Sequence, residues 1–181
     1  MSETPDTTLD NPFWDYSLKV YGMAGFGPAC IAFQDRHGLV VNLLIFCLWA
    51  AHNGQRLESG DLARLEDTIA PWEAEITNPL RAARRWLKGQ DLVPEAQAKA
   101  LGKAILAREL EGEQLEQWLI SQSLPLGAGV PSLELAAGNL LTYLRQAGIA
   151  PDQDDQAALA TLLGAAFPEA EETAIAGLIA G

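Results

Sequence analysis

A carboxylate, a guanidinium and an imidazole follow one another in Gln34-Asp35-Arg36-His37-Gly38, and Asn42 comes four residues later. At the junction of two apolar helices, Asp35, His37 and Asn42 could form a pocket for general acid–base catalysis. Neighbouring residues of a helix point about 100° apart, so these side chains cannot all face one substrate. Helix caps and ion pairs account for the same residues, and we favour that structural interpretation.

The second candidate site is a basic face formed by Arg81, Arg84, Arg85 and Lys88, with Trp86 beside it. The four cations lie three, one and three positions apart, which puts them along one side of a helix. Residues 81–108 hold seven Lys or Arg and two Asp or Glu, a net charge of +5, whereas residues 1–80 carry −7 and residues 109–181 carry −10. This face could bind a protein partner or a small anionic ligand, with Trp86 as an apolar anchor.

The same face could instead be neutralised within the molecule. Four glutamates of the next predicted helix could fold back against it: Glu109, Glu111, Glu113 and Glu116. Charge runs are more often solvated faces than binding sites, so the sequence leaves both interpretations open.

The composition argues against several classes of function. The chain has 181 residues, with 24 Asp or Glu against 12 Lys or Arg and a net charge of −12, so we expect no nucleic-acid partner. Two histidines (His37, His52) and two separated cysteines (Cys30, Cys47) do not complete a zinc site, and we expect no metal. No phosphate-binding loop or nucleophile elbow is present, so we expect no cofactor and favour a protein that is not an enzyme.

The hydropathy of the chain and the composition of residues 1–10 indicate where in the cell the protein is expected. The longest apolar run, Leu43 to Ala51, is nine residues, shorter than the ~20 that a membrane-spanning helix needs. Residues 1–10 are polar and acidic, without the basic and apolar parts of a secretory signal. We therefore expect a cytoplasmic protein without a membrane partner, in which residues 1–10 form a disordered tail.

Apolar residues recur every three or four positions, and Gly, Pro and Asn-Pro punctuate the chain at helical intervals, so the sequence predicts an all-α fold. We expect one helical domain over residues 11–181, a bundle of seven to eight helices around an apolar central helix at residues 43–51. Helices are expected at about 12–21, 28–37, 42–52, 59–87, 94–122, 132–147, 152–166 and 169–179. Residues 59–87 form either one bent helix or two nearly collinear ones, and we favour a break at Asn78-Pro79. The loop at residues 124–131 could be a subdomain boundary.

The same periodicity predicts which side chains face the core. From the first two helices we expect Phe13, Trp14, Leu18, Tyr21, Cys30, Ile31 and Phe33 to be buried. On the long helix, one side carries the apolar residues Leu101, Ile105, Leu115 and Leu119.

Two segments stand out from a generic helical sequence. One is Asn11-Pro12-Phe13-Trp14-Asp15-Tyr16-Ser17-Leu18; the other is Gln34-Asp35-Arg36-His37-Gly38 with Val41-Asn42-Leu43-Leu44. Together with Ala70-Pro71-Trp72, Pro79-Leu80-Arg81 and Glu109-Leu110-Glu111, they resemble a family of small proteobacterial proteins classed as a domain of unknown function. The resemblance implies a cytoplasmic, largely helical protein and transfers no activity. It draws attention to Asp15, Gln34, Asp35, Arg36, His37 and Asn42 without giving any of them a role.

The sequence therefore favours a non-enzymatic interaction or regulatory module that binds a protein partner or a small anionic ligand through its basic face. The alternative is a small enzyme with an acid–base pocket around Asp35, His37 and Asn42. The sequence indicates no oligomeric state.

Overall fold

The computed structural model describes residues 11–180, so the tail expected at residues 1–10 lies outside the described residues. All regular structure within that range is helical, which confirms the predicted fold class. The elements are α1 (Pro12–Tyr21), α2 (Phe26–His37), α3 (Val41–His52), α4 (Ser59–Trp72), the π-helical turn η1 (Glu73–Thr77), α5 (Asn78–Leu87), α6 (Glu95–Ser123), α7 (Leu133–Gln146), α8 (Gln153–Ala166) and α9 (Glu172–Ala180). None of these helices is long and apolar enough to cross a membrane.

Local capping signals set the ends of the first helices. The Asn11 side chain accepts a hydrogen bond from the backbone N–H of Trp14 at 3.3 Å, and Pro12 takes the first helical position. Gly22 follows the end of α1, and Gly38 ends α2 with a φ of 69°, a conformation that suits glycine. These are the boundaries that the sequence predicts.

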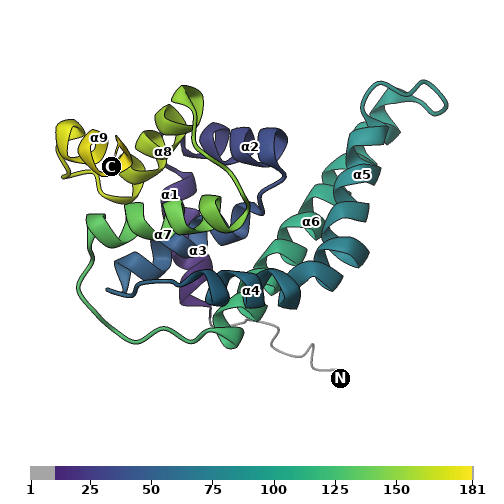
Figure 1. The fold of residues 1–181 in the computed structure, drawn as a ribbon. Helices are drawn as coiled ribbons and strands as arrows, with labels where there is room; N and C mark the ends of the chain where they lie inside the picture. The colour runs from purple at the N-terminus through teal and green to yellow at the C-terminus, as the bar shows by residue number, and fades with distance from the viewer. Residues whose placement is uncertain (1–10, 181) are drawn as a thin grey trace.

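Helix α3 lies at the centre of the body, as predicted (Figure 1). It contacts α1, α2, α4, α6 and α7, and its side chains from Val41 to Leu48, with Ala50 and Ala51, are buried. A helix that is apolar nearly all round must be enclosed in this way. The same hydrophobic core takes in residues on both sides of the loop at 124–131.

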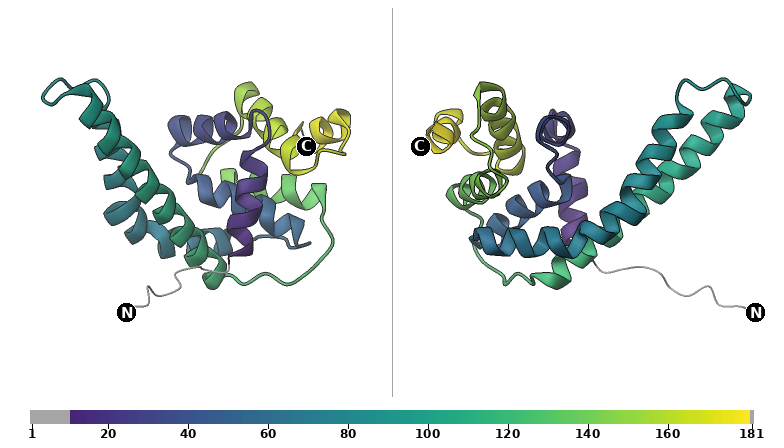
Figure 2. Two further views of the ribbon diagram at one scale, coloured as in Figure 1. Left: turned by 180° about the vertical axis from the view of Figure 1, so that it is seen from behind. Right: turned by 45° about the vertical axis from the view of Figure 1, so that its right-hand side comes forward.

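Helix α5 and the first part of α6 form an antiparallel pair that projects from the body, here named the arm (Figures 1 and 2). Helix α5 buries none of its residues. The chain enters the arm through η1, where the N–H of Asn78 bonds to the carbonyl of Glu73, five residues back.

The break favoured at Asn78-Pro79 is wrong and the alternative, one bent helix, is correct, because Asn78 is itself helical, with φ −67° and ψ −41°. Pro79 has no N–H to donate, and a helix normally kinks or ends there. The π turn shifts the hydrogen-bond register just before the proline, so the helix bends without stopping.

The prediction of buried side chains is wrong at Leu18, Tyr21 and Ile31, which are 56%, 43% and 45% exposed. Leu101 and Leu115, on the apolar side of α6, are exposed as well. Helix α6 instead buries a mostly polar face against α5, η1 and the body: Glu109, Gly112, Glu116, Gln117 and Ile120. An apolar stripe is buried only where another element covers it, and the arm leaves these stripes uncovered.

Candidate functional site

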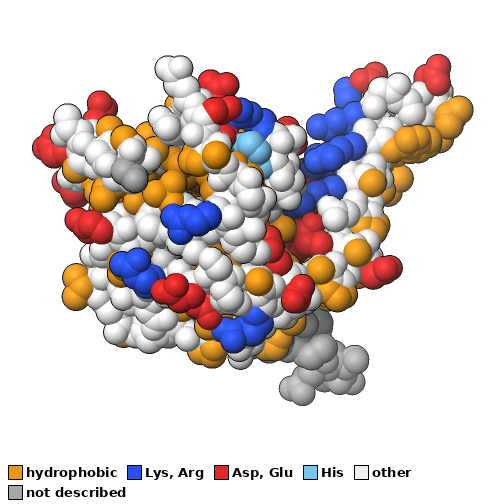
Figure 3. Space-filling view, in the orientation of Figure 1, with side chains coloured by type: hydrophobic (Ala, Val, Ile, Leu, Met, Phe, Trp, Pro, Cys, Tyr) orange, Lys and Arg blue, Asp and Glu red, His pale blue; other side chains and the backbone are white. Residues whose placement is uncertain are grey.

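A cavity of about 240 Å³ opens between the arm and the body, here named the arm cleft. Helices α1 and α2 contribute apolar and aromatic side chains to it, among them Trp14, Leu18, Tyr21 and Ile31. Helix α5 contributes Arg81, Arg84 and Arg85. Figure 3 shows Lys and Arg side chains following one another along the edge of the arm that faces the body. The cleft therefore places guanidinium groups opposite exposed apolar surface.

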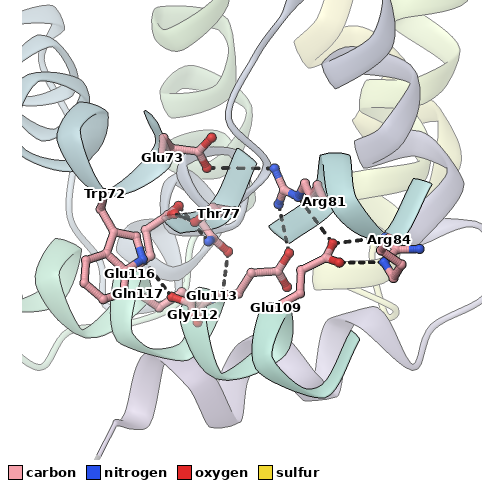
Figure 4. Close-up of polar contacts among 11 residues, drawn as sticks. Trp72, Glu73, Thr77, Arg81, Arg84, Glu109, Gly112, Glu113, Glu116 and Gln117 are labelled. Carbon is pink, nitrogen blue, oxygen red and sulfur yellow. Dashed lines mark hydrogen bonds and ion pairs between the residues drawn. The ribbon is translucent and has the colours of Figure 1, made fainter. Parts of the chain in front are cut away.

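Arg81 is enclosed by carboxylates at the base of the arm (Figure 4). Its Nη2 lies 2.8 Å from Glu113 Oε1, its Nε 3.5 Å from Glu109 Oε1, and its Nη1 3.9 Å from Glu73 Oε1. These contacts fix the guanidinium and neutralise its charge.

Arg84 makes two hydrogen bonds to the buried Glu109, from Nε to Oε2 at 2.6 Å and from Nη2 to Oε1 at 3.0 Å. Arg85 and Lys88 are exposed and make no ion pair with any residue between 11 and 180. Trp86 is 61% exposed on the same helix, but it does not line the arm cleft. The predicted basic face is thus split between cations held by α6 and cations left unpaired.

A buried polar network lies beneath the arm cleft. Asn42 Nδ2 donates to Glu116 Oε1 at 2.8 Å, and Thr77 Oγ1 donates to Glu116 Oε2 at 3.0 Å. Gln117 Nε2 donates to Asn42 Oδ1 at 2.8 Å and its Oε1 accepts from Ser17 Oγ at 2.9 Å. The network joins α1, α3, η1 and α6 where the arm meets the body.

Glu116 is the unusual member of this network. Burial, together with the neighbouring Glu73 carboxylate, raises the pKa of Glu116 to about 7. The sequence placed it among the four glutamates that could neutralise the basic face, but its carboxyl oxygens accept hydrogen bonds from Asn42 and Thr77. The sequence signal for the burial of Glu116 is the row of α6 positions 109, 112, 113, 116, 117 and 120. These positions have the spacing of a buried helix face, but Ile120 is the one large apolar residue among them.

Arg36 and His37 lie elsewhere, where they fasten α2 to the start of α8. Arg36 contacts Asp155 Oδ1 and Asp152 Oδ2, each at 2.5 Å, and His37 Nε2 lies 2.9 Å from Asp155 Oδ1. The two aspartates also form the N-terminal capping box of α8. The hydrogen bond from Arg36 lowers the pKa of Asp152 to about 2.

The three residues of the alternative acid–base pocket share no hydrogen bond with one another. Asp35 is exposed, His37 contacts Asp155, and Asn42 belongs to the buried polar network. Of the other family-motif residues, Asp15 is exposed and Gln34 lines the arm cleft. Within residues 11–180, no group of three or more His, Cys, Asp or Glu is placed to hold a metal ion.

Residues 12–120 match the model of a family described as a protein of unknown function, DUF2390. The chain belongs to this family. The match spans more than half of the chain and contains every residue that lines the arm cleft, whereas Asp152 and Asp155 lie outside it. No curated protein and no solved structure matches the chain. Membership of DUF2390 therefore transfers no described activity to the chain.

Proposed function

We propose that this DUF2390 protein is a non-enzymatic interaction module that binds an acidic segment of a protein partner in the arm cleft. A small anionic ligand is the alternative occupant, because a carboxylate or a phosphate would use the same guanidinium groups. The observation that carries the proposal is Arg85, a cation that lines the cleft without an ion pair in the described part of the chain.

Apolar surface beside that cation supports recognition of a protein segment. Leu18, Tyr21 and Ile31 line the cleft and remain exposed to solvent. Interfaces commonly combine aromatic and apolar anchors with arginine. A partner segment with an acidic side chain next to an apolar one would contact both kinds of surface.

Arg81 and Arg84 support the proposal through their fixed position and not through unpaired charge, because carboxylates of Glu73, Glu109 and Glu113 already neutralise them. Glu109 and Glu113 hold the two guanidinium groups in place before any ligand binds. A group that is already ordered loses less conformational entropy on binding, which favours affinity.

Charge reversal at Arg85 tests the proposal. Arg85→Glu should change the free energy of unfolding by less than about 0.5 kcal/mol, because an exposed, unpaired side chain contributes little to stability. Affinity capture from cells, followed by mass spectrometry, should show that the variant no longer retains partners bound by the wild type. Arg56→Glu is the matched control, since Arg56 is also exposed, makes no ion pair in residues 11–180 and does not line the cleft.

Arg84→Glu should behave differently from Arg85→Glu. It leaves the buried Glu109 without its bidentate partner and adds a second carboxylate nearby, so we expect a loss of about 1–3 kcal/mol of unfolding free energy. An Arg85→Glu variant that keeps the wild-type set of partners would contradict the proposed function. Co-purification of a low-molecular-weight anion, lost in the same variant, would assign the cleft to the small ligand.

A further inference from the structure

A second cavity, of about 810 Å³, lies between α5 and α6 toward the end of the arm and is here named the tip cavity. Leu87, Val93 and Leu106 give it apolar walls, and Lys88 and Lys103 add cations. Arg84 lines both the tip cavity and the arm cleft. The two cavities therefore adjoin.

One face of α6 connects them. Its residues that line the tip cavity run from Glu95 to Leu106, and those that line the arm cleft run from Glu109 to Gln117. Successive members of the set are one, three or four positions apart, which is the spacing of a single helix face. Twenty-two residue steps separate Glu95 from Gln117, or about 33 Å at 1.5 Å per residue.

The unpaired charge along this groove is mostly positive. Arg85, Lys88 and Lys103 make no ion pair among residues 11–180, whereas Glu109 and Glu113 are occupied by arginines and Glu95 by Lys99. Of the acids that line the groove, Asp91 is the one without an ion pair in the described range, residues 11–180. The groove is thus complementary to an occupant that carries several acidic groups along its length.

We propose that the arm cleft and the tip cavity together bind one acidic amphipathic helix of a protein partner, about six turns long. This inference rests on the proposed function and extends it from one cleft to the length of the arm. Acidic side chains of the bound helix would face Arg85, Lys88 and Lys103, and its apolar stripe would pack on the groove between Val93 and Leu110.

The helical form of the occupant follows from the hydrogen-bonding groups that the groove offers. Its walls are helices, whose backbone N–H and C=O groups are already bonded within α5 and α6. An extended peptide would find no strand edge to pair with, whereas a helix satisfies its own backbone and needs only side-chain contacts. A second arm is a poor occupant because residues 81–108 carry +5 in each copy.

The test uses the whole chain and a phage library of random 20-residue peptides as the probe. Enriched peptides should be acidic, with apolar residues three and four positions apart. A synthetic copy of the best peptide should gain helical circular dichroism on binding. Its Kd should rise at least tenfold for Arg85→Glu at one end of the groove and for Lys88→Glu with Lys103→Glu at the other. Arg56→Glu should leave the Kd unchanged, and thermal melts should show that all variants are folded.

The outcomes separate this inference from the proposed function. Acidic peptides that require Arg85 but are indifferent to Lys88 and Lys103, or that bind without helical periodicity, would overturn the helix and leave the cleft proposal standing. If the wild type selects no acidic peptide while Arg85→Glu still loses cellular partners, that result would also overturn the helix inference and leave the proposed function standing. Binding to phosphatidylserine vesicles in place of peptides, or a dimer that the Lys88/Lys103 variant dissociates, would assign the groove to a lipid surface or a second copy and overturn it.

Discussion

At the level of single residues, Glu116 is an ionisable side chain in a buried position, where the charged form is disfavoured. Its carboxyl group is buried and receives hydrogen bonds from Asn42 of α3 and Thr77 of η1. The charged groups that act on it include the Glu73 carboxylate and Arg81, which itself lies 3.9 Å from Glu73. Two carboxylates so close together in a buried site favour binding of a proton.

This proton gives a prediction about pH. The pKa of Glu116 rises from 4.5 to about 7 on folding, so the folded protein holds the proton at pH values where the unfolded chain has lost it. The stabilisation is present in full below the unfolded pKa and is lost as pH rises through the folded one. Between about pH 5 and pH 8 the free energy of unfolding should therefore fall, by at most about 1.4 kcal/mol per pH unit.

Urea denaturation of Glu116→Gln across that pH range checks the assignment. Glutamine keeps the shape and acts as a permanently neutral carboxamide, so the decline with pH should flatten. Glu111→Gln is the matched control, because Glu111 is an exposed glutamate of the same helix, and its profile should follow that of the wild type. Equal slopes for Glu116→Gln and the wild type would show that Glu116 does not carry the proton.

The sequence could identify part of the site at this scale. The spacing of Arg81, Arg84 and Arg85 predicts that they share a helix face, and all three line the arm cleft. Burial of Glu116 could not be predicted, because a glutamate is ordinarily exposed and its hydrogen-bond partners lie at distant positions, Asn42 and Thr77.

Among the elements, the segment between α6 and α7 depends on a close backbone contact. A Cβ atom at Gly129 would lie 2.3 Å from the carbonyl oxygen of Asn53, the residue that follows α3. On the other side of this contact, Gly54 has a φ of 69°, and a Cβ there would lie 2.9 Å from the nitrogen of Val130. Backbone atoms on both sides leave no flexible side chain to move aside.

Gly129→Ala should therefore lower the free energy of unfolding by about 1–3 kcal/mol, since the segment must shift away from the end of α3. Gly138→Ala is the comparison: the same methyl group is added inside α7, where nothing lies within 4 Å of it. Helix propensity favours that change by up to about 1 kcal/mol. Chemical denaturation that ranks the two variants equally, or Gly129→Ala above the wild type, would refute the close contact.

Helix boundaries were predictable because their causes are local. Asn11-Pro12, Gly22 and Gly38 act within a turn of the helix ends that they mark. The π turn was not predictable from the sequence, because Pro71 and Pro79 both favour a break. The packing of η1 against α4, α5 and α6 maintains the helix there. Exposure of Leu18, Tyr21 and Ile31 also depends on tertiary structure, namely on where the arm points.

For the whole molecule, burial is distributed very unevenly. The hydrophobic core draws on α1 to α4 and on α7 to α9, with Ile120 from the far end of α6. Helix α5 buries no residue, and before Glu109 helix α6 buries only Ala98. Helices stabilised by few tertiary contacts open more readily than those in a core, because isolated helices of this length are marginal in water. We therefore expect the arm to open while the body stays folded. Such separate opening would bear on whether residues 11–181 unfold as one domain.

Hydrogen exchange followed by mass spectrometry tests this difference. Backbone amides of α5 and of α6 before Glu109 should exchange at least tenfold faster than those of α3, whose opening requires the core to unfold. The exchange of α7 is the internal control, since α7 packs on α3 and should be slow with it. An arm that exchanges as slowly as α3 would mean that the two parts open together, and the arm would then be a rigid extension of the core. Fast exchange would instead mean that binding of a partner helix must offset the entropy cost of ordering the arm. Its binding should then slow exchange in the arm more than in α3.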